Sequence, residues 1–531
     1  MSQPIQTYSI TAPGFYGLNT QDSSLDLASG FALVANNCVI DKYGRIGARK
    51  GWMRLHNTSD YTLDLDFTTE TYGYDYASAL GTSTVKSIGE LITAAGVSYV
   101  ILTGNNKIWK LLSGALIEVT YGGGGVAPTI TDNNWQIATL NGKLYLFQTG
   151  HDPLVFDPSV STSTYRRVSE VSGYNGTVQQ SNCVISAYGR LWNAVTSSNK
   201  VLIQWSDLLA GHVYQTGSAG TLDLTNVWPK NSDNIVALGA HNGFLFVFGK
   251  NNILIYQNAS DPSAMSLYDV VTGIGCEARD SVCNTGTDII FLSATGVRSV
   301  LRTIQEKSAP FRDLSKNVRD DLLVYVSGSN KDSIKAIYSP LDAFYLLSFP
   351  NSNIVYCFDM RNQLPDGSAR VTTWDSLAPY SFCVKADSTL LVGLTGYLGQ
   401  YSGYLDDTAT YHFQYFTNNT DFGAPSVTSI LKKLSAIVIG GSDQDLVFKW
   451  GYDFTGDYQA SSANIPSQGV AYYGVAEYNI SEYAGGTSLQ TLVVYPTGSG
   501  KIVQTGYETD INGTSLSIQK IEIQAKNGKV V

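Results

Sequence analysis

Short apolar runs separated by turn residues recur along most of the chain. Residues 235–241 and 244–249, for example, are apolar runs that meet at Asn242-Gly243. Such turn residues tolerate the positive φ that tight loops need, so each pair of runs predicts a β-hairpin. Residues 253–256 are apolar without alternation, as expected of a strand covered on both faces. The pattern predicts small sheets that bury one another.

The hairpins repeat at intervals of roughly 50 residues. Their turns are centred on Gly96, Gly142, Gly189, Gly243, Gly286, Ala343 and Ser388. A further short apolar run follows most of them, such as residues 107–109 and 354–358. Units of several strands at this period are typical of a β-propeller, because one four-stranded sheet cannot cover both of its faces. We therefore predict an all-β fold with a propeller of six or seven blades over residues 85–404.

The two ends of the chain do not follow this repeat. Residues 1–84 are predicted to form an N-terminal extended segment with platform strands outside the propeller. From residue 405 the strands lengthen, and residues 516–524 alternate, which predicts a sheet with one wet face. We predict a C-terminal β-sandwich or platform domain over residues 405–531.

Two further segments differ from their surroundings. Residues 314–323 predict a short surface helix with Ser315 as its N-cap, because apolar residues recur at helical spacing. Residues 455–490 are dominated by Gly, Ser, Tyr and Asn, which predicts a long loop or extended hairpins.

Composition agrees with an all-β protein and restricts its partners. Of the 531 residues, 51 are Gly and 34 are Tyr, and hydrophobic residues make up 43%. The net charge is -10, from 34 basic and 44 acidic residues. That balance argues against gripping nucleic acid by neutralising phosphates, which needs a basic face. It allows a surface past which nucleic acid slides without sticking.

No residue pattern predicts catalysis, a metal or a cofactor. The six cysteines contain no CxxC and no histidine pair has zinc-ligand spacing, so we expect buried, reduced thiols. The run Gly122–Gly125 lacks a following Gly-Lys-Ser/Thr and is expected to be a flexible turn. HExxH and Gly-x-Ser-x-Gly sequences are absent, as are the aspartate boxes of hydrolytic propellers. We expect no enzymatic activity, no cofactor, no signal peptide and no membrane insertion.

A basic cluster near the N-terminus is opposite in sign to the whole protein. Within thirteen positions it contains Lys42, Arg45, Arg49, Lys50 and Arg54. Short charge runs usually face water, so a solvated turn is one interpretation. A contact with a neighbouring acidic subunit is the other.

Parts of the chain resemble tail proteins of short-tailed bacteriophages. The opening resembles that of podovirus tail tube proteins in Gly14 to Leu18, Asn37, Gly44, Arg45, Arg49 and Gly51. Residues 235–302 resemble a passage of the packaged-DNA stabilisation (tail hub) protein, with Phe-x-Val-Phe-Gly, Ile-x-Tyr and a glycine connection into a Val-Cys strand. The helix near Ser315 and the strand at residues 432–439 fall in corresponding order.

The resemblance implies the distal tail tube, or nozzle, of a podovirus virion. Such a protein is a hexameric ring docked beneath the adaptor (head-to-tail connector), with propellers outside and a channel for double-stranded DNA. It retains the packaged genome, carries fibres or spikes, and lets DNA pass during ejection without sequence-specific binding. It is made in the host bacterial cytoplasm and assembled into the virion tail. The five basic residues are then candidates for an adaptor or subunit interface.

Two other functions remain open from the sequence. One is a carbohydrate- or receptor-binding propeller on the virion, with loop tyrosines as sugar platforms. The other is a capsule-degrading propeller enzyme. Binding to a glycan array would favour the first, and release of oligosaccharides from host capsule would favour the second.

Overall fold

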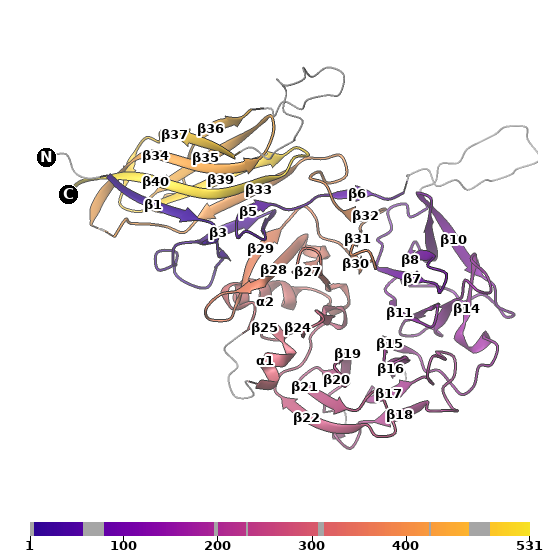
Figure 1. Cartoon of the computed structure of the whole chain (residues 1–531). Helices are drawn as coiled ribbons and strands as arrows, with labels where there is room; N and C mark the ends of the chain where they lie inside the picture. The colour runs from indigo at the N-terminus through magenta and orange to yellow at the C-terminus, as the bar shows by residue number, and fades with distance from the viewer. Residues whose placement is uncertain are drawn as a thin grey trace, which may run out of the picture.

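The computed structural model of this chain describes residues 5–56, 79–195, 200–229, 232–305, 313–423, 426–466 and 489–530. Nearly all regular structure in these residues is β, which confirms the predicted all-β class. No helix among them is long and apolar enough to cross a membrane. Seven small units of three or four strands follow one another around a ring, and two larger sheets lie beside it (Figure 1).

The ring units are numbered here in chain order. The first contains β7 (Ser87–Ile92), β8 (Ser98–Gly104), β9 (Lys107–Leu112) and β10 (Ala115–Tyr121). The second contains β11 (Gln136–Leu140), β12 (Lys143–Phe147), β13 (Leu154–Phe156) and β14 (Thr164–Arg167). The third contains β15 (Ser181–Ala187), β16 (Arg190–Val195), β17 (Leu202–Trp205) and β18 (Gly220–Asp223). The fourth contains β19 (Ile235–His241), β20 (Phe244–Gly249), β21 (Asn252–Gln257) and β22 (Ser266–Thr272).

The remaining units include short helices and one strand from the N-terminal segment. The fifth contains β23 (Cys283–Asn284), β24 (Ile289–Ser293) and β25 (Gly296–Ser299), followed by α1 (Val300–Gln305). The sixth contains β26 (Lys335–Ser339), β27 (Phe344–Phe349), β28 (Ile354–Gln363) and β29 (Ala369–Trp374). The seventh contains β30 (Ser381–Val384), β31 (Leu390–Gly393), β32 (Leu398–Tyr401) and β6 (Trp52–Arg54). Short 3-10 turns are η1 (Val168–Glu170), η3 (Arg279–Ser281), η4 (Lys316–Val318), η5 (Lys331–Ser333) and η6 (Pro350–Ser352).

The predicted hairpin turns are confirmed in every unit. Each of the seven anchor residues lies between the first and second strands of its unit and has positive φ. Even the non-glycine anchors Ala343 and Ser388 adopt φ of 51° and 66°. Tight hairpin loops require this positive φ. The repeat predicted from the sequence therefore corresponds to one such turn in each unit.

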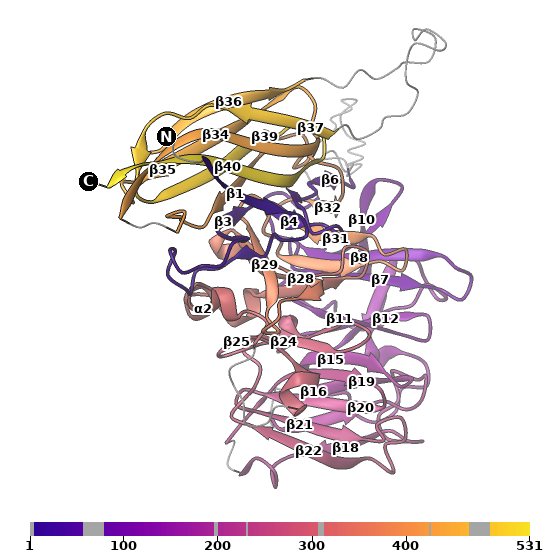
Figure 2. The ribbon, with the colours of Figure 1, turned by 60° about the vertical axis from the view of Figure 1, so that its left-hand side comes forward.

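Each unit buries both of its faces against its neighbours. On β21, Ile253 and Ile255 pack into one cluster with Phe291 of the fifth unit. Leu254 and Tyr256 pack into another cluster with side chains of the third unit. The predicted two-faced burial of residues 253–256 is thus confirmed. Figure 2 shows the sheets stacked on one another.

Contacts between the first strands close the ring. Each first strand contacts the first strand of the next unit, in the order β7, β11, β15, β19, β23, β26 and β30. Strand β30 also contacts β7, which closes the ring. The seventh unit is completed by β6 from the N-terminal segment, with Trp52 opposite Tyr401. A strand from near the chain start therefore covers the outer edge of the last unit.

The run Gly122–Gly125 forms a bend whose glycines are exposed, except Gly123, which is half-buried. It follows β10, whose last two residues pair in parallel with β14 and join the first unit to the second. A Cβ on Gly123 would lie 2.2 Å from a carboxylate oxygen of Glu170. Gly123 therefore favours this close approach, whereas a Cβ on Gly124 would meet open space. The expected turn is present as a bend, and its flexibility stays a prediction.

Two larger sheets pack face to face beside the ring and are called the paired sheets. One contains β1 (Ile5–Thr11), β4 (Cys38–Ile40), β5 (Ile46–Ala48), β34 (Val427–Gly440), β37 (Leu489–Val494), β38 (Ser499–Gly500) and β40 (Leu516–Val530). The other continues outward from β29 through β2 (Gly17–Leu18), β3 (Phe31–Asn36), β33 (Tyr411–Thr417), β39 (Val503–Ile511), β35 (Gln444–Tyr452) and β36 (Gln459–Ile465). Strands from both ends of the chain thus share both sheets.

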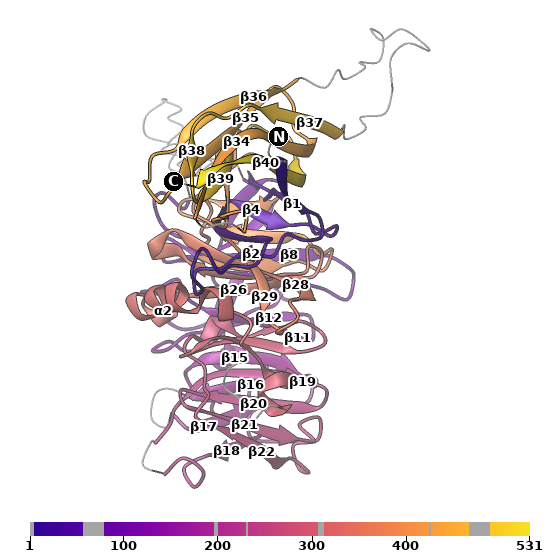
Figure 3. The ribbon, with the colours of Figure 1, turned by 90° about the vertical axis from the view of Figure 1, so that its left-hand side faces the viewer.

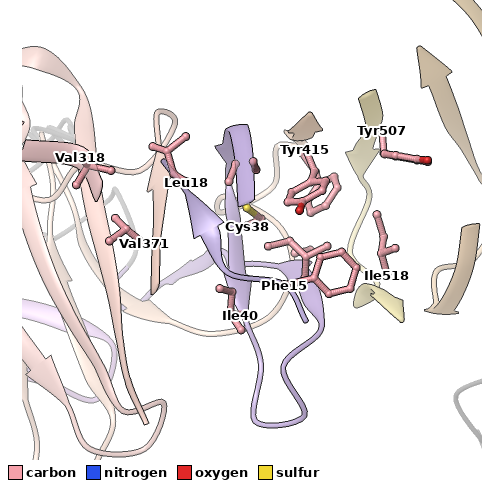
Figure 4. Packing of buried hydrophobic residues seen from close by; sticks show 14 of the residues in the cluster. Phe15, Leu18, Cys38, Ile40, Val318, Val371, Tyr415, Tyr507 and Ile518 are labelled. Atoms are coloured by element: carbon pink, nitrogen blue, oxygen red, sulfur yellow. The ribbon is translucent and has the colours of Figure 1, made fainter. Parts of the chain in front are cut away.

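One hydrophobic core fills the space between the paired sheets and extends into the sixth unit. Phe15 meets Tyr415 edge to face, with ring centroids 5.8 Å apart. Cys38, Tyr507 and Ile518 come from widely separated parts of the chain and lie in the same cluster (Figure 4). The N-terminal segment is therefore part of the core.

The helix prediction was only partly right. Helix α2 (Arg319–Gly328) begins four residues after Ser315, which makes no capping hydrogen bond. The Ser315 hydroxyl instead accepts a hydrogen bond from the Val297 amide at 3.0 Å and is buried. The Ser315 side chain therefore bonds to the fifth unit, which contains Val297, instead of capping the helix.

The alternation predicted for residues 516–524 is interrupted. Pairing of β34 with β40 shifts register between Ile437 and Val438, opposite Lys520 and Ile518. The resulting irregularity lets Ile518 and Ile521 both face the core. Of the predicted loop at residues 455–490, the start forms β36, and residues 467–488 lie outside the described part of the chain.

We expect the approach of β6 to the seventh unit to depend on Gly51. A Cβ there would lie 1.8 Å from the Leu405 carbonyl oxygen, which is backbone and cannot rotate away. Gly51→Ala should lower the free energy of unfolding by about 2 to 3 kcal/mol, as overpacking does. The measurement is the urea midpoint of the full chain. Gly124→Ala, where a Cβ meets open space, is the matched control, and equal midpoints for the two variants would contradict the assignment.

Candidate functional site

The predicted basic cluster lies where the N-terminal segment passes between the ring and the paired sheets. It begins at the turn between β4 and β5, where the Asp41 carboxylate accepts hydrogen bonds from the amides of Tyr43 and Arg45. The Arg45 side chain also pairs with Asp41 at 2.6 Å. Lys42 and Arg45 both lie over the Tyr43 ring, with cation-to-centroid distances of 4.9 and 4.4 Å. The turn presents an aromatic ring between two cations.

Arg49 is enclosed by its own chain. Its guanidinium makes two hydrogen bonds to Asp406, at 2.9 and 2.6 Å, and one to Ser376 at 2.5 Å. It also lies over the Tyr411 ring at 4.0 Å, and its exposed fraction is 0%. Arg49 therefore presents no charge to a partner, and the interface prediction depends on the other four cations.

Two more of the predicted residues form ion pairs within the chain. Lys50 pairs with Asp342 at 2.9 Å, and Arg54 pairs with Asp407 at 2.5 Å. Both pairs are partly exposed, so solvent screens them and each adds at most about 1 kcal/mol to stability. Lys42 forms no ion pair within the described residues.

Three of the predicted cations line a cleft of about 440 Å³ between the N-terminal turn, the sixth unit and the paired sheets. Its charged lining residues are the cations Lys42, Arg45, Lys50 and Arg361 and the carboxylates Asp41 and Asp342. Leu341 also lines the cleft and is 68% exposed, and Tyr43, beside Lys42, is 58% exposed. We call the cleft, with Tyr43 at its rim, the basic cleft. The basic cleft therefore has more cations than carboxylates and lies beside exposed apolar side chains.

A second charged cluster lies near the axis of the ring, in a cavity of about 360 Å³. The Arg279 guanidinium grips Asp280 through two hydrogen bonds of 2.8 and 2.7 Å. The Lys335 ammonium donates to both Asp280 and Asn134. Arg279 also reaches the Asn182 carbonyl in the third unit at 2.7 Å. The cluster therefore joins units across the ring.

Opposing effects act on the Asp280 carboxyl. Burial alone would raise its pKa, but the neighbouring Arg279 and Lys335 hold the pKa well below its usual range. Burial is also the main influence on Lys335, and it lowers the pKa of that ammonium. The carboxylate is therefore ionised at neutral pH and neutralises part of the buried positive charge. Sequence reasoning missed this cluster because its members are unremarkable singly and meet only through the ring.

The described residues contain no group of three or more His, Cys, Asp or Glu placed to hold a metal ion. All six cysteines are buried and unpaired. Burial raises the pKa of the Cys183 and Cys276 thiols to about 12, so neither is poised as a thiolate nucleophile.

Comparisons with known proteins leave the family open. No family model matches the chain, and no curated protein matches it. Among solved structures, the extracellular domain of a one-component system from B. thetaiotaomicron has a TM-score of 0.41 and 10% identity, over 90% of this chain and 62% of that one. The extracellular domain of a hybrid two-component system from the same organism has a TM-score of 0.37 and 11% identity, over 63% and 41%. This chain thus spans less than two thirds of either.

A third structural neighbour is shorter. The WD40 domain of Neurospora crassa Pan2 has a TM-score of 0.35 and 8% identity, with 60% of this chain and 89% of that domain covered. With TM-scores below 0.5, these likenesses assign neither a family nor a function.

Removal of the Asp280 charge should strongly destabilise the ring. Asp280→Asn leaves Arg279 and Lys335 buried without a counterion, which costs about 3 to 5 kcal/mol. Asp280→Asn combined with Lys335→Met should recover part of the loss, because it removes the stranded ammonium. The urea midpoint measures both variants, and Asp387→Asn, at an exposed ion pair with Lys385, should change stability by less than about 1 kcal/mol. A double variant no more stable than the single one would contradict the proposed role of charge.

The same pair predicts how stability depends on pH. The pKa of Asp280 is lower in the folded state than the value of about 3.9 expected in the unfolded chain. Its contribution is therefore fully present above about pH 4 and is lost as pH falls through the folded pKa. The difference in urea midpoint between the wild type and Asp280→Asn should be constant from pH 8 to 5 and shrink in stronger acid. A difference that widened in acid would contradict this sign.

Proposed function

We propose that the chain is a subunit of the distal tail tube, or nozzle, of a short-tailed bacteriophage virion. In this proposal it assembles into a hexameric ring beneath the adaptor, retains packaged DNA and conducts it during ejection. The proposal starts from the sequence resemblance to podovirus tail tube and tail hub proteins. Its role is mechanical, and it needs a rigid body with docking surfaces rather than a reaction centre.

We infer that the seven ring units are the blades of a seven-bladed β-propeller and that the paired sheets are a β-sandwich platform. Contacts between successive first strands, with β30 returning to β7, support the propeller. Addition of β6 to the last unit supports it further, because a strand from a distant part of the chain closes the circle. The shared core supports treating the N-terminal segment as part of the platform.

The observation that carries the proposed function is the interlocking of the two bodies. Strand β6 belongs to the ring, whereas β1 and β5 pair with β40 in the paired sheets. The segment between them is held by the enclosed Arg49–Asp406 pair. A subunit built in this way resists relative movement of its parts, as required of a wall that must hold pressurised DNA.

The charge of the chain suits a conduit. A net charge of -10 leaves little general attraction for phosphates. Each phosphate contact that had to be released would slow the passage of DNA. The basic cleft is a local exception, and we assign it to protein contacts with a neighbouring subunit or the adaptor. Fibres or spikes would attach elsewhere on the body.

The test is the assembly state of the purified full chain. Negative-stain images and mass photometry should reveal closed rings of about six copies around a channel wide enough for duplex DNA, as closed cyclic symmetry predicts. The same preparation should bind no glycan on an array and release no oligosaccharide from capsule. A protein that stays monomeric at every concentration and binds glycans would overturn the proposal in favour of a receptor-binding propeller.

A further inference from the structure

Two surfaces of different charge lie toward opposite ends of β28. Arg361, near its end, lines the basic cleft, whereas Ile354, at its start, lines a second hollow of about 350 Å³. Seven residues of extended strand separate them by about 23 Å, at roughly 3.3 Å per residue. The two hollows therefore lie near opposite ends of this strand.

The second hollow is an apolar groove between α2 and the N-terminal strands. Its apolar lining residues are Leu18, Leu33, Val34, Ala35, Val324, Tyr325, Ile354 and Tyr356. Val324 is 66% exposed although it lies in the middle of α2. Figure 3 shows α2 projecting from one side of the body. Val324 thus leaves an exposed apolar side chain at this groove.

One aspartate lines this groove and two more lie close to its lining residues in the sequence, so we call it the acidic groove. Asp321 lines it, and Asp320 precedes Asp321 at the start of α2. Asp22 follows two residues after Thr20, another lining residue, whose amide donates to the Asn317 carbonyl at 2.9 Å and holds the loop near α2. All three aspartates are exposed, and none forms an ion pair within the described residues.

The cations closest in sequence to the aspartates of α2 are paired with other carboxylates. Lys316 pairs with Asp366 at 2.6 Å, and Arg319 pairs with the buried Asp313 at 2.6 Å. The acidic groove thus combines an apolar floor with negative charge that no cation of the described chain offsets. The basic cleft has the complementary features, namely Lys42, which has no ion pair there, and the exposed side chains of Tyr43 and Leu341.

We propose that the acidic groove of one copy receives the rim of the basic cleft of the next copy. This inference rests on the proposed function, since it assigns the contact that builds the ring. The two surfaces are separate on the subunit, so we take the contact as head-to-tail, and its repetition forms a ring when the rotation between copies closes. Lys42 of one copy then faces Asp321 of the next, while Tyr43 and Leu341 cover the apolar floor.

Charge reversal tests the contact without disturbing the fold. Lys42 and Asp321 are exposed and form no ion pair with the described residues of their own chain, so Lys42→Glu and Asp321→Lys should leave the circular dichroism spectrum unchanged. Each variant places like charges across the contact and should weaken self-association of the full chain at least about tenfold. Sedimentation velocity at matched concentrations measures the effect. Lys250→Glu, at an exposed lysine of the fourth unit, is the control and should assemble like the wild type.

Mixing the two variants distinguishes a specific contact from general damage to the protein. The glutamate that Lys42→Glu introduces in one variant can pair with the lysine that Asp321→Lys introduces in the other. The native residues that each variant retains can pair across the alternate contacts. An equimolar mixture, and the double variant Lys42→Glu/Asp321→Lys, should therefore recover assembly toward the wild-type level. Recovery requires a contact between copies that joins these two positions, and general damage to the protein would not produce it. The size of the recovered assembly separates a ring from a two-fold dimer.

The outcomes separate this inference from the proposed function. Wild-type protein that never forms rings would overturn both. Wild-type rings that both reversed variants form equally well would overturn only this contact and assign the cleft to another acidic partner. Two-fold dimers, or loss of assembly that mixing does not restore, would also overturn it. Binding of a short DNA duplex that Lys42→Glu abolished would assign the cleft to nucleic acid instead.

Discussion

The enclosed pair of Arg49 and Asp406 is the interaction on which the arrangement of the two bodies depends. Burial of two charges costs more than their attraction returns unless hydrogen bonds satisfy the rest of each group. Here Asn37, Ser376 and the Lys50 carbonyl supply those bonds, and the Tyr411 ring covers the guanidinium. Loss of either partner would strand a charge at the junction, so the pair fixes where the N-terminal segment crosses.

The N-terminal segment links two sets of strand pairings, one in the paired sheets and one in the ring, that could otherwise form separately. On one side of Arg49, β5 pairs with β40 and β4 in the paired sheets. On the other side, β6 completes the seventh unit of the ring. The distance along the chain between Arg49 and these strands is only a few residues, so neither set of pairings can shift without moving the other. The outer part of the sixth unit adds a second link, because β29 pairs with β2 and the sheet continues into the paired sheets.

Local features of the fold were predictable from sequence, and non-local ones were not. Hairpin turns such as Asn242-Gly243 could be placed because positive φ is a property of a few adjacent residues. Double burial of residues 253–256 followed from their unbroken apolarity. By contrast, nothing near Trp52 indicates that its partner strand lies at Tyr401, and the hydroxyl of Ser315 is taken by Val297 rather than by the helix that follows. Pairing between distant segments depends on the whole fold.

In the candidate site, too, the local feature was predictable from sequence and the distant partners were not. The density of cations from Lys42 to Arg54 was visible in the sequence, but their partners Asp342, Asp406 and Asp407 lie 292 or more residues away. Most of that positive charge therefore holds the N-terminal segment in place. What remains for a partner is Lys42, which has no ion pair among the described residues, together with Tyr43 and the partly exposed neighbours of the cleft. In a chain with 44 acidic residues, this exposed cation beside exposed apolar side chains is the part of the predicted interface that the fold does not use for its own ion pairs, so the proposed contact depends on it.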